Sequence, residues 1–482
     1  MMSTIELDYN SSKCTRIIKV EDKDIRDRLY HAFSTPNNAK KFVRGPQRQY
    51  IPDNIYFITP MGSFNFGLAE LIIQWLKENT NQNELDWKIS DSFKERYSFE
   101  DEVRFRDKLK LKLRDYQKDA VLTALKHKFG TFVMGTGAGK TLTIASLLDN
   151  LFHYKKIKRA MILVPDNGLV LQFRDELVNQ YGIKQAVTLF YDKFNRVDTQ
   201  DRLIIANRPL FLSRWEQYKK FWQDKIDCLI VDEAHSLKHS NEVSKCISKM
   251  HCNYKFGFTG TLAETKEDKF KTIGLLRPVR YEKTSKELRD EGFLSDVTVR
   301  RLHLVYPERP YYMTYKNEIL FLENNEYRNK FLTKLVFRLN KNTLILVNHL
   351  DHGFTLEEYF RKNNKDKQIY FIRGEVETEL REKIKKLMEK QNNIICIAIT
   401  KIFSTGINIK NLHNIVLCSG GKSSITVIQS IGRGLRLHPD KKELNIFDIV
   451  DTHYKYAESH AQKRKQIYSD EKINCKDYTI EI

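Results

Sequence analysis

The chain has 482 residues, enough for about three domains of ordinary size and for a large core without disulfide or metal support. It contains 82 lysines and arginines against 62 aspartates and glutamates, and the net charge of +20 favours a polyanionic partner. An apolar fraction of 41% with 30% charged residues excludes a disordered chain. No apolar run approaches the roughly 18 residues of a membrane-spanning helix, so we expect no membrane partner.

The N-terminus has no basic start followed by an apolar stretch, so we expect no secretory signal and a cytoplasmic location. The seven cysteines are odd in number and scattered, and several lie in apolar runs, which predicts reduced, buried thiols. The one local group, Cys246, His251 and Cys252, lacks a second pair of ligands, so the sequence does not favour a metal site there.

The predicted elements fall into three parts along the chain. Residues 1–105 combine a strand-like run at 54–58 with an amphipathic stretch at 67–77, which predicts a small α+β N-terminal accessory domain. From about 105 onward, short apolar runs alternate with segments of helical spacing, the pattern of parallel sheets wrapped by helices. The sequence therefore predicts an α/β fold with a first parallel-sheet domain at 106–285 and a second at 286–482, which includes the interdomain connection and the C-terminal tail.

Two series of apolar runs define the predicted sheets. We assign about 265–342 to the interdomain connection with the first strand and helix of the second sheet, and 315–339 is its helix-like segment. The runs of the first series are 131–134, 160–164, 203–206, 228–231 and 255–258, and those of the second are 343–347, 368–372, 394–399, 414–418 and 444–447.

The sequence Met134-Gly-Thr-Gly-Ala-Gly-Lys140-Thr141 follows a predicted strand and opens a predicted helix, the context of a phosphate-binding loop. In such a loop, backbone N–H groups converge on phosphate oxygens, a lysine reaches the β- and γ-phosphates, and a hydroxyl ligates Mg²⁺. Lys140 and Thr141 hold the last two positions, whereas Met134 replaces the usual small residue. The predicted nucleotide-binding residues are Gly135, Thr136, Gly137, Ala138, Gly139, Lys140 and Thr141.

A second motif, Val231-Asp-Glu-Ala-His235, places two adjacent carboxylates at the end of an apolar strand. Ligands of open α/β sheets bind at that edge. Adjacent side chains diverge at a strand end, so one carboxylate can hold a metal while the other polarises the attacking water. We predict that Asp232 holds Mg²⁺ and that Glu233 acts on the water.

The third motif lies in the second domain at 429–436. Gln429, Arg433 and Arg436 are spaced by four and three residues, which places them on one face of a helix. Two guanidiniums directed together repel each other, so they require concentrated negative charge, and a γ-phosphate supplies it. We therefore predict that these catalytic residues include an arginine finger within the same chain. The alternative is a solvated basic helix end.

In this order, the motifs resemble those of superfamily 2 helicases of the DEAH-containing type, over about 105–455. The resemblance implies two tandem RecA-like domains, with ATP and Mg²⁺ as cofactors. It implies that Gln117 reads adenine, that Thr259 and Thr261 couple hydrolysis to domain movement, and that Gly406 and Asn408 sense the nucleotide from the second domain. The implied nucleic-acid contacts are Pro165, Gln172, Arg208, Asn348 and Thr400; Asp166 departs from the usual Thr or Ser of its motif.

The segment 403–413 followed by 429–436, together with an N-terminal accessory domain, is similar to the UvsW-type branch-migration helicases of tailed phages. This implies an ATP-dependent DNA helicase or translocase that acts on single-stranded and on forked or junction DNA in recombination, repair or replication. It also implies a nucleic-acid contact by 1–105 and, for a phage protein, the host cytoplasm. Other replication or recombination proteins remain open as partners.

Alternatives remain. The core motifs leave open an RNA helicase and the motor subunit of a restriction-type nuclease complex. A non-hydrolysing nucleic-acid scaffold is disfavoured by the intact lysine, acidic pair and arginines, and a P-loop kinase does not explain Gln429, Arg433 and Arg436.

Overall fold

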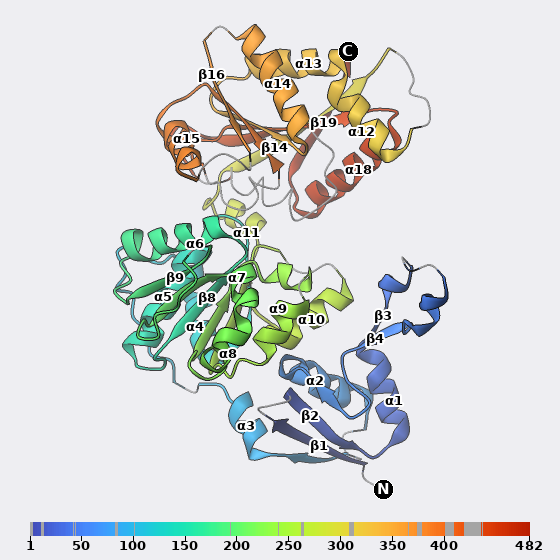
Figure 1. The fold of residues 1–482 in the computed structure, drawn as a ribbon, viewed down its shortest axis with the longest axis vertical. Coiled ribbons are helices and arrows are strands. Elements are labelled where there is room, and N and C mark those ends of the chain that lie inside the picture. Colours follow the sequence, from blue (N-terminus) through green and yellow to red (C-terminus); the bar gives the residue numbers. More distant parts are fainter. Residues whose placement is uncertain are drawn as a thin grey trace. The chain divides into compact units, whose positions relative to one another are not determined.

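The structure is a computed structural model that describes residues 3–10, 14–41, 43, 45–81, 85–100, 102–192, 194–239, 241–261, 265–307, 313–364, 366–373, 378–400, 409–418, 435 and 437–482. The chain forms two compact units. Unit 1 comprises Met1–Met134 and Gly139–Glu282, and unit 2 comprises Gly135–Ala138 and Lys283–Ile482. Each unit contains one seven-stranded sheet, and unit 1 also contains a smaller sheet built from the N-terminal residues (Figure 1).

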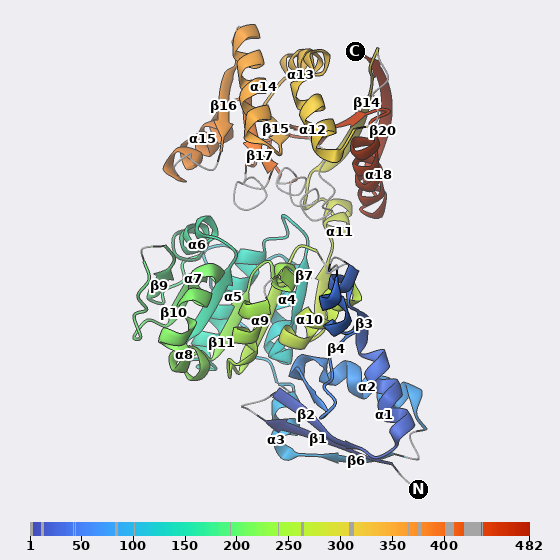
Figure 2. The same ribbon diagram turned by 45° about the vertical axis from the view of Figure 1, so that its right-hand side comes forward.

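The N-terminal part of unit 1 is an α+β fold. Its four-stranded sheet has the order β5-β2-β1-β6, in which β1 is antiparallel to β2 and parallel to β6 (Figure 2). The strands are β1 (Ser3–Asn10), β2 (Cys14–Val20), β5 (Ser63–Phe64) and β6 (Leu85–Ile89), with a separate ribbon of β3 (Ser34–Pro36) and β4 (Asn54–Tyr56). The helices are α1 (Lys23–Ala32), α2 (Ala69–Asn79) and α3 (Asp91–Tyr97), with 3₁₀ turns η1 (Asn38–Lys41), η2 (Pro46–Tyr50) and η3 (Phe66–Leu68).

The core of this accessory fold continues into the helix α10 (Lys266–Leu276) of the same unit. Ile5, Leu29 and Ile72 are fully buried in a cluster against which Phe270 and Ile273 of α10 pack. The backbones approach closely at Gly67, where any side chain would collide with the carbonyl oxygen of Ile273. The accessory fold is therefore packed onto the helix that follows Thr261.

The first seven-stranded sheet has the order β13-β7-β12-β11-β8-β10-β9, and β7, β12, β11, β8, β10 and β9 pair in parallel. Parallel strands covered by helices on both faces are continuous apolar runs, and all five predicted runs of the first series lie in strands. The strands are β7 (Phe129–Met134), β8 (Ala160–Val164), β9 (Val187–Phe190), β10 (Leu203–Asn207), β11 (Cys228–Val231), β12 (Tyr254–Thr259) and β13 (Val279–Lys283).

Helices cover this sheet (Figures 1 and 2). They are α4 (Asp115–His127), α5 (Lys140–His153), α6 (Asn167–Arg174), α7 (Arg208–Ser213), α8 (Trp215–Asp224), α9 (Asn241–Ser248) and α10, with a π-helical turn η5 (Asp175–Gln180) and a 3₁₀ turn η6 (Ala234–His239).

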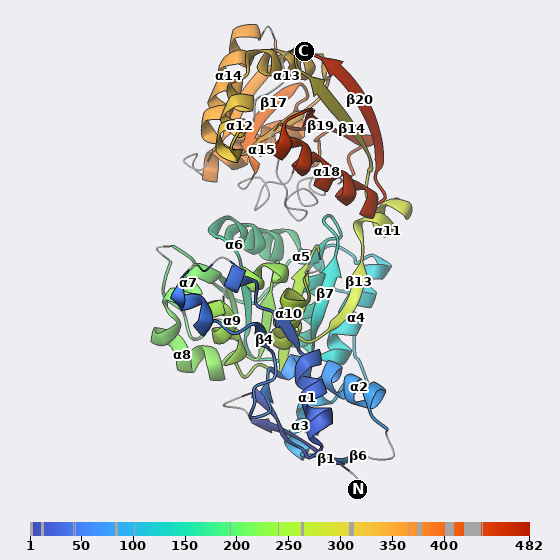
Figure 3. The same ribbon diagram turned by 90° about the vertical axis from the view of Figure 1, so that its right-hand side faces the viewer.

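The second seven-stranded sheet has the order β16-β17-β15-β18-β19-β14-β20, and all six pairings are parallel. Figure 3 shows the long strands β14 and β20 side by side. Every predicted run of the second series lies in or overlaps one of its strands. The strands are β14 (Asp296–Val305), β15 (Thr343–Val347), β16 (Gln368–Ile372), β17 (Ile394–Ile399), β18 (Asn414–Leu417), β19 (Glu443–Asp451) and β20 (Asn474–Glu481).

The predicted helix at 315–339 is two helices, because Asn325 ends α12 and its side chain accepts a hydrogen bond from the Arg328 backbone at the start of α13. Within its described residues, unit 2 has the helices α11 (Ser285–Asp290), α12 (Tyr315–Asn324), α13 (Glu326–Arg338), α14 (Leu350–Asn363), α15 (Thr378–Lys390) and α18 (Lys455–Asp470).

The sequence also makes predictions about the cysteine thiols and about membrane-spanning helices. The thiols of Cys228, Cys246, Cys252, Cys396 and Cys418 are free and buried, as predicted, and that of Cys475 is half-buried. No helix in the described part of the chain has the length and apolarity to cross a lipid bilayer.

Candidate functional site

The predicted phosphate-binding loop connects β7 to α5. Gly137 and Gly139 have φ of +89° and +77°, in the left-handed region that residues with a side chain rarely adopt. The Ala138 amide donates to the Gly135 carbonyl at 3.0 Å and closes the turn. Because α5 begins at Lys140, the amide groups of its first turn and the positive end of its dipole lie at the loop, where an anion is stabilised.

Three side chains of this loop, those of Thr136, Lys140 and Thr141, are half-buried. The Lys140 ammonium donates to the Met134 carbonyl at 3.4 Å and lies close enough to Asp232 to lower the pKa of that carboxyl. The structure thus brings the lysine of one motif to the carboxylate of another, 92 residues further along the chain.

Asp232 lies at the carboxyl end of β11, where its amide donates to the Leu163 carbonyl at 3.0 Å. The residue is only 4% exposed, and its Oδ1 has no hydrogen-bond partner among the described residues. Burial, followed by the charge of Glu233, raises the pKa of Asp232 to about 7, against the opposing charges of Lys140 and Arg208. A buried carboxylate oxygen with no donor to satisfy it suits a cation.

The donors here fit Mg²⁺. This ion takes oxygen ligands and is held in nucleotide sites by one or two protein groups together with phosphates. The Asp232 carboxylate and the Thr141 hydroxyl are hard oxygen donors of that kind. When bound, Mg²⁺ supplies charge that stabilises the phosphoryl oxygens.

Glu233 is linked by side chains to the predicted coupling residues. His235 Nδ1 lies 3.3 Å from Glu233 Oε2 and 2.9 Å from Thr259 Oγ1. The Thr259 hydroxyl donates its single proton to the Thr261 carbonyl at 2.8 Å. In the hydrogen bond between His235 and Thr259, the donor is therefore His235 Nδ1. Glu233, His235, Thr259 and Thr261 therefore form one chain of interactions at the ends of β11 and β12.

Gln117, the predicted adenine reader, lies beside the phosphate-binding loop. Its side chain is buried, and its Oε1 accepts from the Arg114 amide at 3.0 Å, which fixes the side chain at the start of α4. Its Nε2 lies where a side chain on Gly139 would be. The glutamine is thus held next to Gly139 of the phosphate-binding loop.

Two predicted nucleic-acid contacts follow β8 in unit 1. Pro165 is half-buried directly after the strand, and the Gln172 amide donates to Glu176 Oε1 at 2.7 Å within the next helical segment. Both side chains are partly open to solvent at the carboxyl edge of the sheet.

Two others lie in unit 2. Asn348 is exposed directly after β15, and Thr400 follows the neighbouring strand β17. The Thr400 hydroxyl donates to the Val347 carbonyl at 2.9 Å, so the structure brings Asn348 and Thr400 to the same edge of the second sheet.

Arg208 does not fit its predicted contact with nucleic acid. The side chain is 7% exposed, and its Nη2 donates to the backbone carbonyls of Asp232 and Glu233, at 3.1 Å for the second. Its Nη1 donates to Ser236 Oγ. The guanidinium is therefore buried and directed into the acidic turn. The predicted residues Gly406, Asn408, Gln429, Arg433 and Arg436 lie outside the described residues.

The sequence is similar to known proteins over most of its length. Residues 110–264 match the family described as "Type III restriction enzyme, res subunit", and residues 327–438 match "Helicase conserved C-terminal domain". The ATP-dependent DNA helicase UvsW of Enterobacteria phage T4 is 30% identical over 393 residues, which cover 76% of this chain and 77% of UvsW. The chain belongs to the superfamily 2 helicases. As a helicase it is a nucleic-acid-dependent ATPase.

Solved structures support the fold of this helicase. The restriction-modification enzyme LlaBIII bound to DNA has a TM-score of 0.59 at 14% identity and covers 88% of this chain and 35% of its own. Dbp5 of S. cerevisiae bound to RNA and ADP BeF3 has a TM-score of 0.54 at 15% identity, over 76% of this chain and 90% of Dbp5. The predicted pair of tandem RecA-like domains is confirmed.

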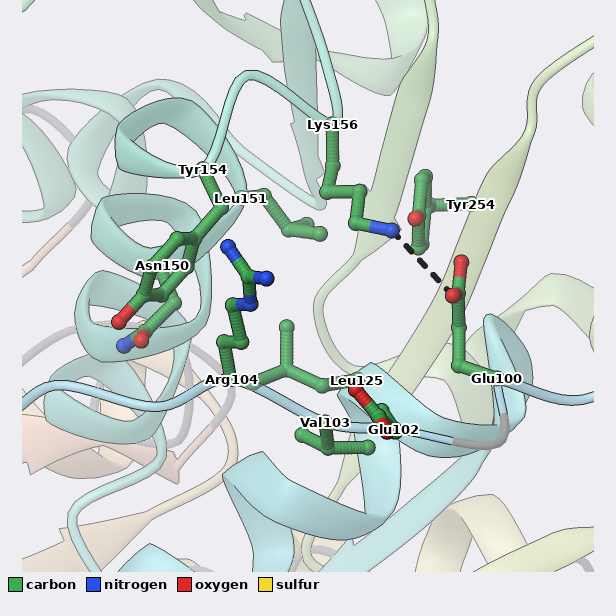
Figure 4. A pocket seen from close by; sticks show the side chains of 10 residues that line it. All are labelled: Glu100, Glu102, Val103, Arg104, Leu125, Asn150, Leu151, Tyr154, Lys156 and Tyr254. Carbon is green, nitrogen blue, oxygen red and sulfur yellow. Dashed lines mark hydrogen bonds and ion pairs between the residues drawn. The ribbon is translucent and has the colours of Figure 1, made fainter.

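The helicase also has a cavity of about 280 Å³ away from these motifs, near the C-terminal end of α5 and the start of β12. Figure 4 shows Arg104 pointing into it beside Lys156, which is paired with Glu100 at 3.2 Å. Predicted site residues do not line this cavity.

Two residues of the acidic turn that make side-chain contacts there are absent from the sequence-based prediction. His235 lies within the second motif, and its place two residues after Glu233 is a signal that could identify it. Ser236 carried no signal, because its importance arises only from the hydrogen bonds of its hydroxyl in the folded turn.

Proposed function

We propose that this helicase acts on DNA and unwinds or branch-migrates forked and junction DNA in recombination, repair or replication. The observation that carries the proposal is the 30% identity to a phage DNA helicase over three quarters of this chain. The net charge of +20 supports it, because a motor that tracks a phosphate backbone needs sequence-independent positive charge.

In the proposed ATPase site, residues of 106–285 bind Mg-ATP. Lys140 contacts the β- and γ-phosphates, and Asp232 with Thr141 holds Mg²⁺. Glu233 orients the attacking water and accepts its proton, and Gln117 reads adenine. The support is the buried Asp232 Oδ1, which has no hydrogen-bond partner in the described part of the chain, together with the Lys140 charge, which lowers the pKa of that carboxyl.

Residues of 286–482 complete the proposed cycle. Arg433 and Arg436, with Gln429, stabilise the charge that develops on the γ-phosphate, and Gly406 and Asn408 sense the nucleotide. Asn348 and Thr400 contact the strand through its backbone, together with Pro165 and Gln172. Loss of the γ-phosphate removes the charge that attracts the arginines, so hydrolysis alters the grip on the strand.

The accessory domain, residues 1–105, is proposed to contact the nucleic acid with its segment 46–61. Tyr50 is 80% exposed, Met61 70% and Tyr56 47%, and Arg48 beside them is also exposed. Bases at a fork stack on exposed aromatic side chains, and an arginine adds attraction for the backbone. Exposed aromatic area of this extent costs solubility unless a partner covers it.

The test compares ATP hydrolysis with single strands, duplexes, forks and four-way junctions of DNA and with RNA strands of the same sequence. We expect forks and junctions of DNA to stimulate hydrolysis most, and Lys140→Ala to abolish hydrolysis while DNA still binds. Equal or greater stimulation by RNA would favour the RNA helicase instead.

A restriction-type motor subunit is the second candidate, favoured by the family that matches residues 110–264 and by the likeness to LlaBIII. It requires a nuclease partner. Affinity purification of the native complex, followed by a DNA cleavage assay, separates the two: a co-purifying nuclease activity that depends on ATP supports the second candidate.

A further inference from the structure

We propose that Arg208 is a positioning residue for ATP hydrolysis, which holds the backbone turn of Asp232 and Glu233 so that the two carboxylates face the nucleotide. The proposal rests on the roles proposed above for Asp232 and Glu233, and it replaces the predicted nucleic-acid contact of Arg208.

The side chain reaches the turn across the carboxyl edge of the first sheet. Arg208 follows β10, Asp232 follows β11, and β8 lies between these two strands. The start of α7 is fixed by Asn207, whose side chain accepts from the Leu210 amide at 2.8 Å. From there the Arg208 side chain crosses the end of β8. The charge of Asp166, which follows β8, favours the charged form of the guanidinium.

The guanidinium binds three points of the turn. Its Nη2 donates to the carbonyls of Asp232 and Glu233, and its Nη1 donates to Ser236 Oγ. The Ser236 hydroxyl in turn donates to the Glu233 carbonyl at 2.7 Å. Buried carbonyls require donors. Arg208 donates to two consecutive peptide groups, and the Glu233 carbonyl also accepts from the Ser236 amide at 3.0 Å.

The turn needs this support because its backbone is strained. Glu233 has φ of +47°, a left-handed conformation that is unfavourable for a residue with a side chain. Such a conformation persists only where surrounding contacts impose it. The direction of the Glu233 side chain depends on this φ, so the bonds that hold the peptide groups on both sides of its Cα help to determine where the carboxylate points.

Charge supports the same role. Burial lowers the pKa of Arg208 to about 10, against the raising effect of Asp232, Glu233 and Asp166, so the group remains charged at neutral pH. The Arg208 guanidinium is therefore a permanent positive charge in contact with the turn of Asp232 and Glu233. Lysine keeps that charge but is a single point donor without the planar fork, so it cannot reproduce the bonds to both carbonyls and to Ser236.

The experiment uses the full chain and the variants Arg208→Lys and Ser236→Ala. Arg214→Lys is the matched control, because Arg214 is an exposed arginine in the same region whose side chain bonds only Gln217 among the described residues. Measured are kcat and KM for ATP with saturating forked DNA, DNA affinity without nucleotide at several salt concentrations, and Tm.

For Arg208→Lys we expect kcat to fall by between about tenfold and a hundredfold, since misplacement of a catalytic group by about 1 Å costs that much. KM for ATP and DNA affinity with its salt dependence stay close to wild type. Ser236→Ala lowers kcat by a smaller factor with the same pattern, and Arg214→Lys changes neither quantity. A role in general stability alone would lower Tm without this separation of kcat from KM.

Wild-type kcat in Arg208→Lys would overturn the proposal. So would normal kcat with weakened DNA binding and a salt slope reduced by about one, which is the signature of a phosphate contact. If Arg208→Lys fails to fold, Ser236→Ala decides, and an unchanged kcat there overturns the proposal. Failure of the proposed function is a separate result, in which the wild type shows no DNA-stimulated hydrolysis at all.

Discussion

The two RecA-like domains bury charge in different ways. In the first, Asp232 is buried with an oxygen that has no hydrogen-bond partner among the described residues, and its pKa is raised. In the second, Arg328 Nε binds Asp451 at 2.8 Å and Arg464 Nη2 binds Asp448 at 2.7 Å, with both pairs buried. A buried charge left unsatisfied marks a site that waits for a ligand, whereas a buried charge that is paired is part of the scaffold.

The pKa values follow this difference. Burial opposes the charged form of Arg328 and of Arg464, but the facing aspartates outweigh it and raise the pKa of both guanidiniums. At Asp232 burial is the dominant cause, and the nearby cations only limit the shift. The paired buried ions of the second domain thus make it rigid. In the first domain, the buried Asp232 carboxylate lacks such a pair and is stabilised when a ligand binds.

Breaking a scaffold pair has the largest expected effect. Asp451→Asn leaves the buried Arg328 without its counter-ion, so we expect the free energy of unfolding to fall by about 3–5 kcal/mol. Urea denaturation measures it. Glu326→Gln removes an exposed partner of Lys330 and serves as the control, because an exposed ion pair contributes little to stability. Equal losses in both variants would contradict a scaffold role for the Arg328 pair.

Asp232→Asn should separate activity from stability. Removal of the proposed Mg²⁺ ligand is expected to lower ATP hydrolysis by about a hundredfold to a thousandfold. Because the variant also removes an unsatisfied buried charge, its Tm without nucleotide is expected to equal or exceed that of the wild type. ATPase assays and thermal unfolding of the same preparation check both. A large fall in Tm would place Asp232 among the scaffold charges.

The exposed aromatic segment of the accessory domain gives an intermediate effect. Tyr50→Ala should weaken binding of single-stranded or forked DNA by about 1–3 kcal/mol, because one stacking platform is lost. Fluorescence anisotropy measures the affinity, and Tyr327→Ala, which removes another exposed tyrosine, is the control. Unchanged DNA affinity in Tyr50→Ala would show that no base stacks on Tyr50.

The pH dependence is the smallest effect. Since the pKa of Asp232 is raised to about 7 in the folded chain, the folded state holds a proton that the unfolded state has lost, and the stability from this group declines as pH rises from about 4 to 7. Binding of Mg²⁺ requires the ionised carboxylate, so its affinity should rise by up to about tenfold between pH 6 and 7. Calorimetry with Mg-ATP tests this, and Asp232→Asn should lose the dependence.

Most strands could be predicted from the sequence because the interior strands of parallel sheets are buried on both faces. The runs at 160–164 and 394–399 are examples, and each is an interior strand. In the two seven-stranded sheets, the sequence predicts no run at β9, β13 or β20, and each of these strands lies at a sheet edge. In β20 most residues are exposed, so its sequence has no apolar run to recognise.

The site divides in a similar way. Lys140, Asp232 and Glu233 lie in compact motifs whose spacing carries the chemistry, and they could be found from the residues alone. The partners of Arg208 could not be predicted, because they depend on the order of β10, β8 and β11 across the sheet. An arginine that follows a strand can bind either a phosphate or a backbone carbonyl. Only the burial of its side chain in the folded chain distinguishes these two roles.

The most direct test of the proposed catalytic site is hydrolysis by Glu233→Gln with and without forked DNA, together with its affinity for Mg-ATP. We expect ATP and DNA to bind as in the wild type, while DNA-stimulated hydrolysis falls by about a hundredfold or more. Hydrolysis at the wild-type rate would show that Glu233 does not act on the water and would contradict the assignment of the acidic turn.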